Sequence, residues 1–213
     1  METIAAYSRS VNETHRICTH DISGHLHLLR FCMDEINEKD GEAPRDLLDR
    51  LDEGLEKLEA LNKLLKIATR YFNPDEEISA ESVAEKALGL TNLYHHKFLD
   101  KLNYEVSGNM VYSLDEATLI IEALFGICST ISHFATGQSV KTLTFNLEFN
   151  DGEIVIKANV GNISQDEILT LLKSGNENDK TLRRANAHDL LVQNGGEIKY
   201  EPAGKEITVR ILK

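Results

Sequence analysis

Residues 20–29, HDISGHLHLL, hold three histidines and one aspartate in a stretch with the composition of an amphipathic helix. His20 directly precedes Asp21, and His25 and His27 follow on the same predicted helix. Such an imidazole has three chemical interpretations: a solvated side chain, a metal ligand, or a nucleophile that accepts a phosphoryl group. The surrounding elements must decide among them.

A metal site on one helix needs ligands on the same face, at spacings of three or four residues. His15 with Cys18 or Thr19 offers only part of such a set, and His25 and His27 point apart. The pattern therefore predicts no metal ligand in this chain.

A phosphoryl acceptor needs an exposed ring nitrogen and a neighbour that holds the tautomer and takes up the proton. The helix carries one apolar stripe at alternating steps of four and three residues: Ile22, Leu26, Leu29, Met33 and Ile36. At about 100° per residue, His20 lies about 160° from Ile22 and is expected to face solvent. Asp21 is the predicted neighbour, although a solvated carboxylate explains it equally well.

Two long helices position this stretch, one over residues 4–38 and one over residues 45–72. Gly41 and Pro44 lie between the two helices. Each helix has a narrow apolar seam. A lone helical hairpin of this kind leaves apolar surface in water, so we expect two copies to pair as a dimeric four-helix bundle. The alternative is that the hairpin packs on the rest of its own chain.

The pattern changes after Phe72. Residues 142–149 alternate between apolar and polar side chains, and Asn150-Asp151-Gly152 turns the chain into a second strand. Another hairpin is predicted at 197–212, and helices at 79–97, 114–134 and 180–193. Ser113 with Glu116, and Ser164 with Glu167, have the spacing of capping boxes. The fold class is α+β, with domains predicted at 1–74 and 75–213.

The composition limits the partners and the cellular compartment to be expected for this chain. The chain has 213 residues, 41% of them hydrophobic, and a formal charge of −12, which argues against nucleic acid or an anionic membrane as a partner. The three cysteines are widely spaced and odd in number, as expected in a reducing cytoplasm. The first residues lack the profile of a signal peptide, and no apolar run has the length of a membrane span. We expect a cytoplasmic protein.

HDISGHLHLL, followed by the second helix LDRLDEGLEKLEALNKLLKIATRYF, resembles the dimerisation and phosphoacceptor domain of two-component histidine kinases. The remainder resembles the ATP-binding domain of these kinases in the order of its elements. The resemblance implies an ATPase-like α/β sandwich after the hairpin, and it makes His20 the phosphorylated residue.

The ATP-site motifs of the kinases are missing. Ser129 stands where they carry the asparagine that holds Mg²⁺, and Phe125 precedes it by one turn. Asn159 replaces the aspartate that grips adenine, with Gly161 the only glycine there. The stretch 175–190 has no Gly-x-Gly to form a phosphate-binding lid. We therefore expect a degenerate domain that binds no ATP.

A phosphoacceptor hairpin without an ATP site resembles the dimeric histidine phosphotransferases of bacterial phosphorelays. The resemblance implies that His20 carries a phosphoryl group between aspartates of response-regulator receiver domains, with a hybrid histidine kinase as a candidate partner. It implies no intrinsic cofactor, since Mg²⁺ would come with the receiver. The alternatives are a pseudokinase adaptor that binds or blocks a kinase or regulator, and an active kinase with a divergent nucleotide site.

Further residues are candidates for contact with the phosphoryl group or the receiver. Lys66 and Arg70 are expected level with His20 on the second helix. Leu28 and Phe31 form an apolar ledge on the outer face of the first helix. The remaining candidates are Ser23, Gly24 and His27, and Gly24 occupies the position where phosphatase-active kinases carry Thr or Asn.

Overall fold

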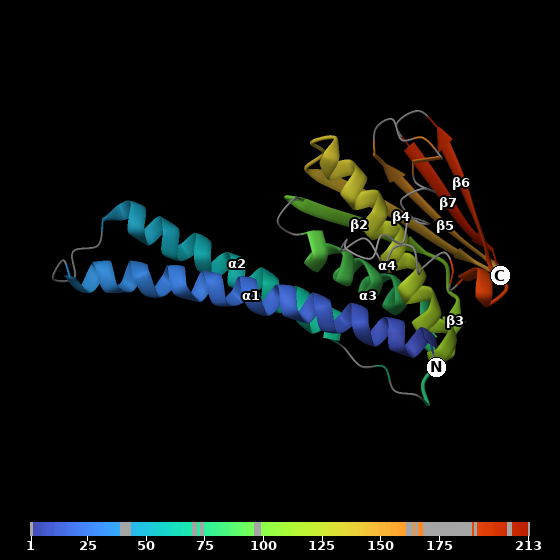
Figure 1. The fold of residues 1–213 in the computed structure, drawn as a ribbon, viewed down its shortest axis with the longest axis horizontal. Coiled ribbons are helices and arrows are strands. Elements are labelled where there is room, and N and C mark those ends of the chain that lie inside the picture. The colour runs from blue at the N-terminus through green and yellow to red at the C-terminus, as the bar shows by residue number, and fades with distance from the viewer. Residues whose placement is uncertain are drawn as a thin grey trace.

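A computed structural model shows a long helical hairpin attached to an α+β layer (Figure 1). It describes residues 2–38, 44–69, 72, 75–95, 99–160, 164, 166–167, 189, 191–203 and 206–212.

The hairpin consists of α1 (Glu2–Glu38) and α2 (Arg45–Thr69), which pack against each other. The Cys18 thiol donates a hydrogen bond to the Leu61 carbonyl over 3.9 Å, so these residues are level across the two helices. Nearer the turn, Leu29 lies against Gly54, where a Cβ would come within 2.9 Å of the Leu29 side chain. The two contacts define the register of the antiparallel pair.

The buried side of α1 is rotated from the predicted apolar stripe. Cys18 and Cys32 are fully buried, whereas Leu26 and Met33 are 54% and 58% exposed. The reason is that α2 packs on one flank of the stripe, while α3 and α4 contact α1 elsewhere. The other flank of the stripe stays uncovered in the single chain.

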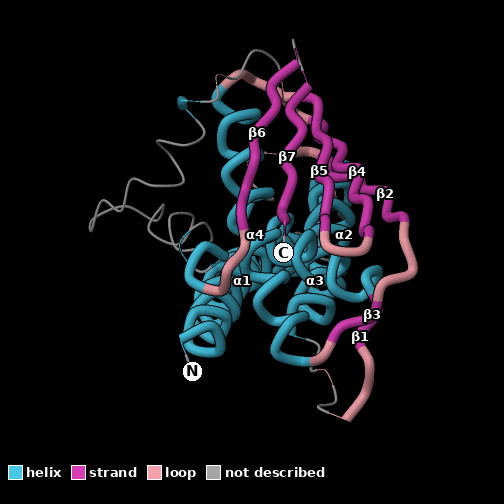
Figure 2. The backbone as a smooth tube through the Cα atoms, turned by 90° about the vertical axis from the view of Figure 1, so that its right-hand side faces the viewer, coloured by secondary structure: helices cyan, strands magenta, loops and turns pink. Residues whose placement is uncertain are grey.

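The second layer begins with β1 (Ile78–Ser79), α3 (Ala80–His95), β2 (Lys101–Ser107), β3 (Val111–Tyr112) and α4 (Leu114–Gly137). It continues with β4 (Thr142–Asn150), β5 (Glu153–Asn159), β6 (Glu197–Ala203) and β7 (Glu206–Leu212). The five-stranded sheet has the order β2-β4-β5-β7-β6. Figure 2 looks onto this sheet, with the helices behind it.

The sheet is mixed. β2 pairs parallel to β4, with Lys101 opposite Thr142, whereas β4–β5, β5–β7 and β6–β7 are antiparallel. The alternation predicted for 142–149 is confirmed, because its apolar members all face the helices: Leu143, Phe145, Leu147 and Phe149. Both predicted hairpins are confirmed as well. β3 pairs with the short β1 instead of joining the main sheet.

α4 is the central helix of this layer. Its predicted capping box is confirmed: the Ser113 hydroxyl accepts from the Glu116 amide, and the Glu116 side chain accepts from the Ser113 amide. Among the described helices it alone is long and apolar enough to cross a membrane, but most of it is buried. It is thus the central core helix of this layer.

Parts of the sequence prediction fall outside the described residues. The Ser164–Glu167 capping contacts are present, with the Ser164 hydroxyl 2.6 Å from a Glu167 carboxylate oxygen. The helix that they would start, and most of the helix predicted at 180–193, are not described. The domain boundary between residues 74 and 75 remains a prediction.

Candidate active site

His20 lies on the exposed side of α1, next to a buried carboxylate. Its Nδ1 is 3.0 Å from Oδ1 of Asp21, and the two side chains are 82% and 6% exposed. A carboxylate only accepts hydrogen bonds, so Nδ1 carries the proton in this pair. That tautomer leaves the lone pair on Nε2, the nitrogen available to an electrophile.

The helix itself produces this arrangement. Neighbouring residues are about 100° apart, so one can face solvent while the next faces a packed neighbour. Asp21 turns toward the interior, where its negative charge adds to burial in raising the pKa of the Cys18 thiol. The imidazole is consequently anchored from its buried side and open to solvent on the other.

A groove of about 800 Å³ runs beside His20, between the hairpin and the second layer. α1 contributes His20, Asp21, Gly24 and His25; α2 contributes Lys57, Ala60, Leu61 and Leu64; and the second layer contributes Asn92, Leu99 and Asp100. The groove is open to solvent and combines apolar walls with charged groups of both signs.

The other predicted residues are distributed around this groove. The Ser23 hydroxyl donates a hydrogen bond to the Thr19 carbonyl over 2.9 Å, so its proton is engaged within α1. Gly24 lines the groove, and no atom lies within 4 Å of the position that a Cβ would take there. His27 is exposed on α1 outside the groove lining, and Leu28 and Phe31 are exposed as expected.

The basic residues predicted to lie near His20 on the second helix are not those found in the described lining of the groove. Lys66 is exposed but does not line the groove, and Arg70 lies outside the described residues. The register places Leu61 level with Cys18, so Lys57 is the cation that lines the groove with His20. Its Nζ is 2.5 Å from a Glu53 carboxylate oxygen, and this contact lowers the pKa of Glu53.

Sequence reasoning missed four polar residues of the groove: His25, Lys57, Asn92 and Asp100. The sequence pattern gives His25 no role, and the position of Lys57 depends on a register that the hairpin turn does not define. Asn92 reaches the groove because α3 packs against both hairpin helices, and Asp100 lies between α3 and β2. No local pattern signals such an approach. Within the described ranges, no three His, Cys, Asp or Glu side chains are grouped to hold a metal ion.

Ser129, the residue at the expected position of the Mg²⁺-holding asparagine, is part of the core. Its hydroxyl is 2.8 Å from Nε2 of His95, and both residues are buried. Phe125 is buried one turn earlier, and the Tyr94 ring packs edge-on against it with centroids 6.2 Å apart. Gly161 and the stretch 175–188 lie outside the described residues.

Comparison with solved structures identifies the fold. A structure described as a bacterial phosphotransferase aligns over 99% of this chain and 95% of its own, with a TM-score of 0.55 and 14% sequence identity. The chain shares the fold of a bacterial phosphotransferase. The shared fold extends over nearly the whole chain, and the structure confirms the coarse α+β assignment.

Other similar structures are kinases. The Acinetobacter baumannii histidine kinase AdeS aligns over 90% of this chain and 95% of its own, at 17% identity and a TM-score of 0.46. A histidine kinase domain from Erythrobacter litoralis aligns over 96% of this chain and 92% of its own, at 13% identity and a TM-score of 0.45. No protein-family model and no curated protein sequence matches the chain.

Proposed function

We propose that this chain is a histidine phosphotransferase that relays a phosphoryl group between receiver-domain aspartates through phospho-His20. Nε2 of His20 attacks the phosphorus of an aspartyl phosphate, a P–N bond forms, and the P–O bond to the aspartate breaks. The donor aspartate leaves as a carboxylate. A second receiver's aspartate then attacks phospho-His20, which reverses these steps and restores the neutral imidazole.

Asp21 has a defined role in this reaction. Attack by Nε2 places a positive charge on the ring while Nδ1 keeps its proton, and the carboxylate 3.0 Å away stabilises that charge. Because both the acyl phosphate and the phosphohistidine are high-energy species, the chain needs mainly to align the reactants and balance their charges. The single observation that carries the proposal is this exposed imidazole held by a buried carboxylate beside an open groove.

The proposal assigns the phosphoryl donor to a protein. Burial of Ser129 against His95 supports a domain that does not present a metal ligand to a nucleotide. ATP binding is therefore not part of the proposed mechanism. A receiver domain would bring the Mg²⁺ that neutralises the phosphoryl oxygens, and a hybrid histidine kinase is a candidate source of the donor receiver.

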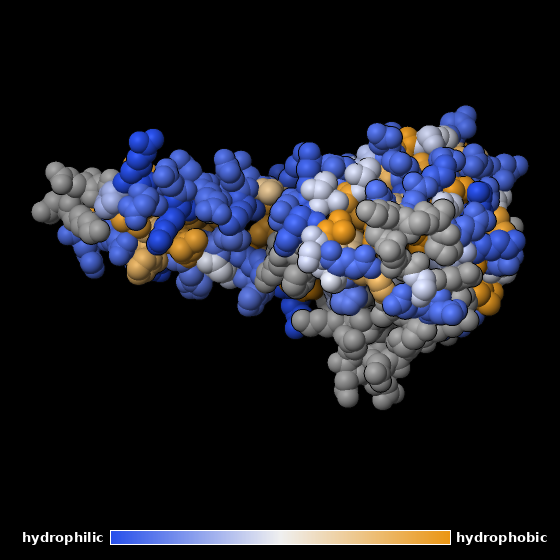
Figure 3. Space-filling view, turned by 90° about the horizontal axis from the view of Figure 1, so that it is seen from above, coloured by the Kyte–Doolittle hydropathy of each residue, from blue (hydrophilic) through white to orange (hydrophobic). Residues whose placement is uncertain are grey.

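A homodimer is the second element of the proposal. Large apolar side chains are exposed on both hairpin helices: Leu26, Leu28, Phe31, Met33, Leu48 and Leu55. Figure 3 shows hydrophobic side chains at the surface of the hairpin, away from the sheet. A second copy that covers the flank with Leu26 and Met33 would complete a four-helix bundle. Leu28 and Phe31 face another direction and are proposed to contact the receiver.

Phosphotransfer from purified receivers tests the function directly. Receivers encoded in the same genome are labelled on their aspartate with ³²P and mixed with the chain, with His20→Gln and with His27→Gln as a matched control. We expect an acid-labile, alkali-stable label on the wild type and on the His27 variant, and none on His20→Gln.

Two results would contradict the proposal. If no receiver labels the wild type while one of them binds it, the chain is a non-catalytic adaptor. If γ-labelled ATP labels His20 without another kinase, the chain is an active kinase with a divergent nucleotide site.

A further inference from the structure

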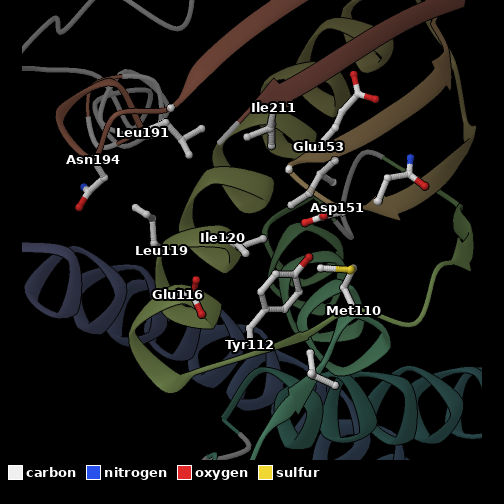
Figure 4. Close-up of a pocket in the computed structure, with 15 residues that line it drawn as sticks. Met110, Tyr112, Glu116, Leu119, Ile120, Asp151, Glu153, Leu191, Asn194 and Ile211 are labelled. Carbon is white, nitrogen blue, oxygen red and sulfur yellow. The ribbon is translucent and has the colours of Figure 1, made fainter.

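A second cavity, of about 540 Å³, lies in the α+β layer (Figure 4). It is lined by β3 and the residues before it, the first turns of α4, the β4–β5 turn, β7, and residues near the start of β6. Its described lining includes no residue of α1 or α2. It is therefore separate from the groove beside His20, and its size is typical of small-molecule sites.

The inner wall of this cavity is apolar. Five lining residues are almost completely buried: Tyr112, Ile120, Ile154, Leu191 and Ile211. They come from five separate segments of the layer, so the wall is built by the fold and not by one loop. An occupant with an apolar body would replace water along this wall, which is favourable in proportion to the area covered.

The charged side chains in the described lining of the cavity are all acidic. Its described lining contains Glu116, Asp151 and Glu153 but no Lys, Arg or His. Glu153 pairs with Arg210, 3.0 Å away, and Figure 4 shows its carboxylate directed away from the space. The Asp151 carboxylate and the Tyr112 hydroxyl instead face the same space in Figure 4. Burial, together with the charge of Glu116, raises the pKa of Tyr112, so its phenol remains a neutral hydrogen-bonding group.

We propose that this cavity binds a small organic amine, with its ammonium group at Asp151 and its apolar body against Ile120, Ile154 and Ile211. A carboxylate beside an apolar wall, in a lining whose described residues include no cation, favours a ligand that is both positively charged and apolar. This site goes beyond the phosphotransfer proposed for His20, and either one can fail without the other.

Three probes with the same six-carbon body and different charge separate the contribution of the charged contact from that of the apolar wall: hexylammonium, 1-hexanol and hexanoate. Each is titrated into the full chain, followed by calorimetry and by amide NMR shifts near Gly152 and Ile120. We expect saturable binding of hexylammonium, about tenfold weaker binding of hexanol, and no binding of hexanoate. Hexanol lacks the charge-assisted contact with Asp151, and the carboxylate of hexanoate is repelled by that residue.

Asp151→Asn is the decisive variant. Asp151 precedes Gly152, whose φ of 73° forms the two-residue turn, and asparagine suits that position equally well. We expect it to weaken hexylammonium binding about tenfold and to leave hexanol binding unchanged. Asp52→Asn, on the exposed surface of α2, changes the net charge by the same amount and should alter neither.

The proposal is wrong if hexylammonium gives no saturable binding, or if Asp151→Asn and Asp52→Asn weaken it equally. A blocked lysine, N-acetyl-lysine methylamide, distinguishes a free amine from a protein side chain as the source of the ammonium group. Binding of the blocked lysine without binding of hexylammonium would also overturn the proposal, because the apolar body would then not be what the cavity recognises.

Discussion

Nδ1 of His20 and Oδ1 of Asp21 lie 3.0 Å apart, with the imidazole almost fully exposed and the carboxylate buried. Consecutive residues on a helix achieve this only at the edge of a packed interface, where one side chain faces inward and the next faces outward. The pair therefore holds the ring from below without covering Nε2.

Asp21→Asn tests the electrostatic role of this contact. Asparagine keeps an oxygen acceptor for Nδ1 but removes the charge that stabilises the phosphorylated ring. We expect transfer from a phosphorylated receiver to slow by at least about tenfold, measured as the rate of label loss from the donor in rapid-quench experiments. An unchanged rate with an intact circular dichroism spectrum would show that Asp21 only positions the helix.

Two matched variants test the role of the lysine that lines the groove. Lys57 lines the groove and Lys66 does not, although both are exposed lysines on α2. We expect Lys57→Met to slow transfer about fivefold at low salt, with a smaller effect at high salt because exposed charges are screened. Lys66→Met should have no effect. If Lys66→Met slows transfer and Lys57→Met does not, the role that the sequence predicts for Lys66 is favoured and that of Lys57 is wrong.

The two exposed apolar surfaces of α1 should have separate functions. Met33→Glu and Leu26→Glu are expected to convert a dimer into a monomer, as measured by sedimentation equilibrium. Each buried apolar side chain contributes about 1.5–3 kcal/mol, and each substitution occurs twice in a symmetric interface. The dissociation constant should therefore rise by at least about 100-fold.

Phe31→Glu is the control on the opposite face. It should leave the dimer intact and weaken receiver binding, which titration calorimetry would measure. If Phe31→Glu dissociates the dimer and Met33→Glu does not, the two surfaces have been assigned the wrong way round.

The stability of the chain should fall at alkaline pH because of Cys128. This thiol is completely buried in α4, and burial raises its pKa above that of an unfolded cysteine. The neutral thiol is favoured in the fold, so its contribution is fully present below the unfolded pKa of about 8.5 and is lost as the pH rises above it.

Urea unfolding of the wild type and Cys128→Ala between pH 7 and pH 10 measures this contribution. The stability difference between the two should be constant below pH 8. Above about pH 9 it should shrink by about 1.4 kcal/mol per pH unit. A difference that stays constant to pH 10 would show that the thiol ionises as readily in the fold as in the unfolded chain.

Much of this molecule follows from local sequence. The alternation at 142–149 predicts a strand with one buried face, because successive strand side chains point to opposite sides. Ser113 and Glu116 predict the start of α4, because their side chains satisfy backbone groups within one turn. The exposure of His20 follows from its angle to the apolar stripe. All three depend on contacts between residues close in the chain.

The groove depends on tertiary structure. Leu61 lies level with Cys18 because whole side chains interlock along α1 and α2, and this register makes Lys57 the groove-lining cation. Asn92 and Asp100 are about 70 to 80 positions from His20 and line the same groove because α3, which carries Asn92 and precedes Asp100, packs against the hairpin. The sequence by itself predicts the pairing of His20 with Asp21, because they are neighbours on one helix. Only the packing of distant segments decides which other groups line the groove beside them.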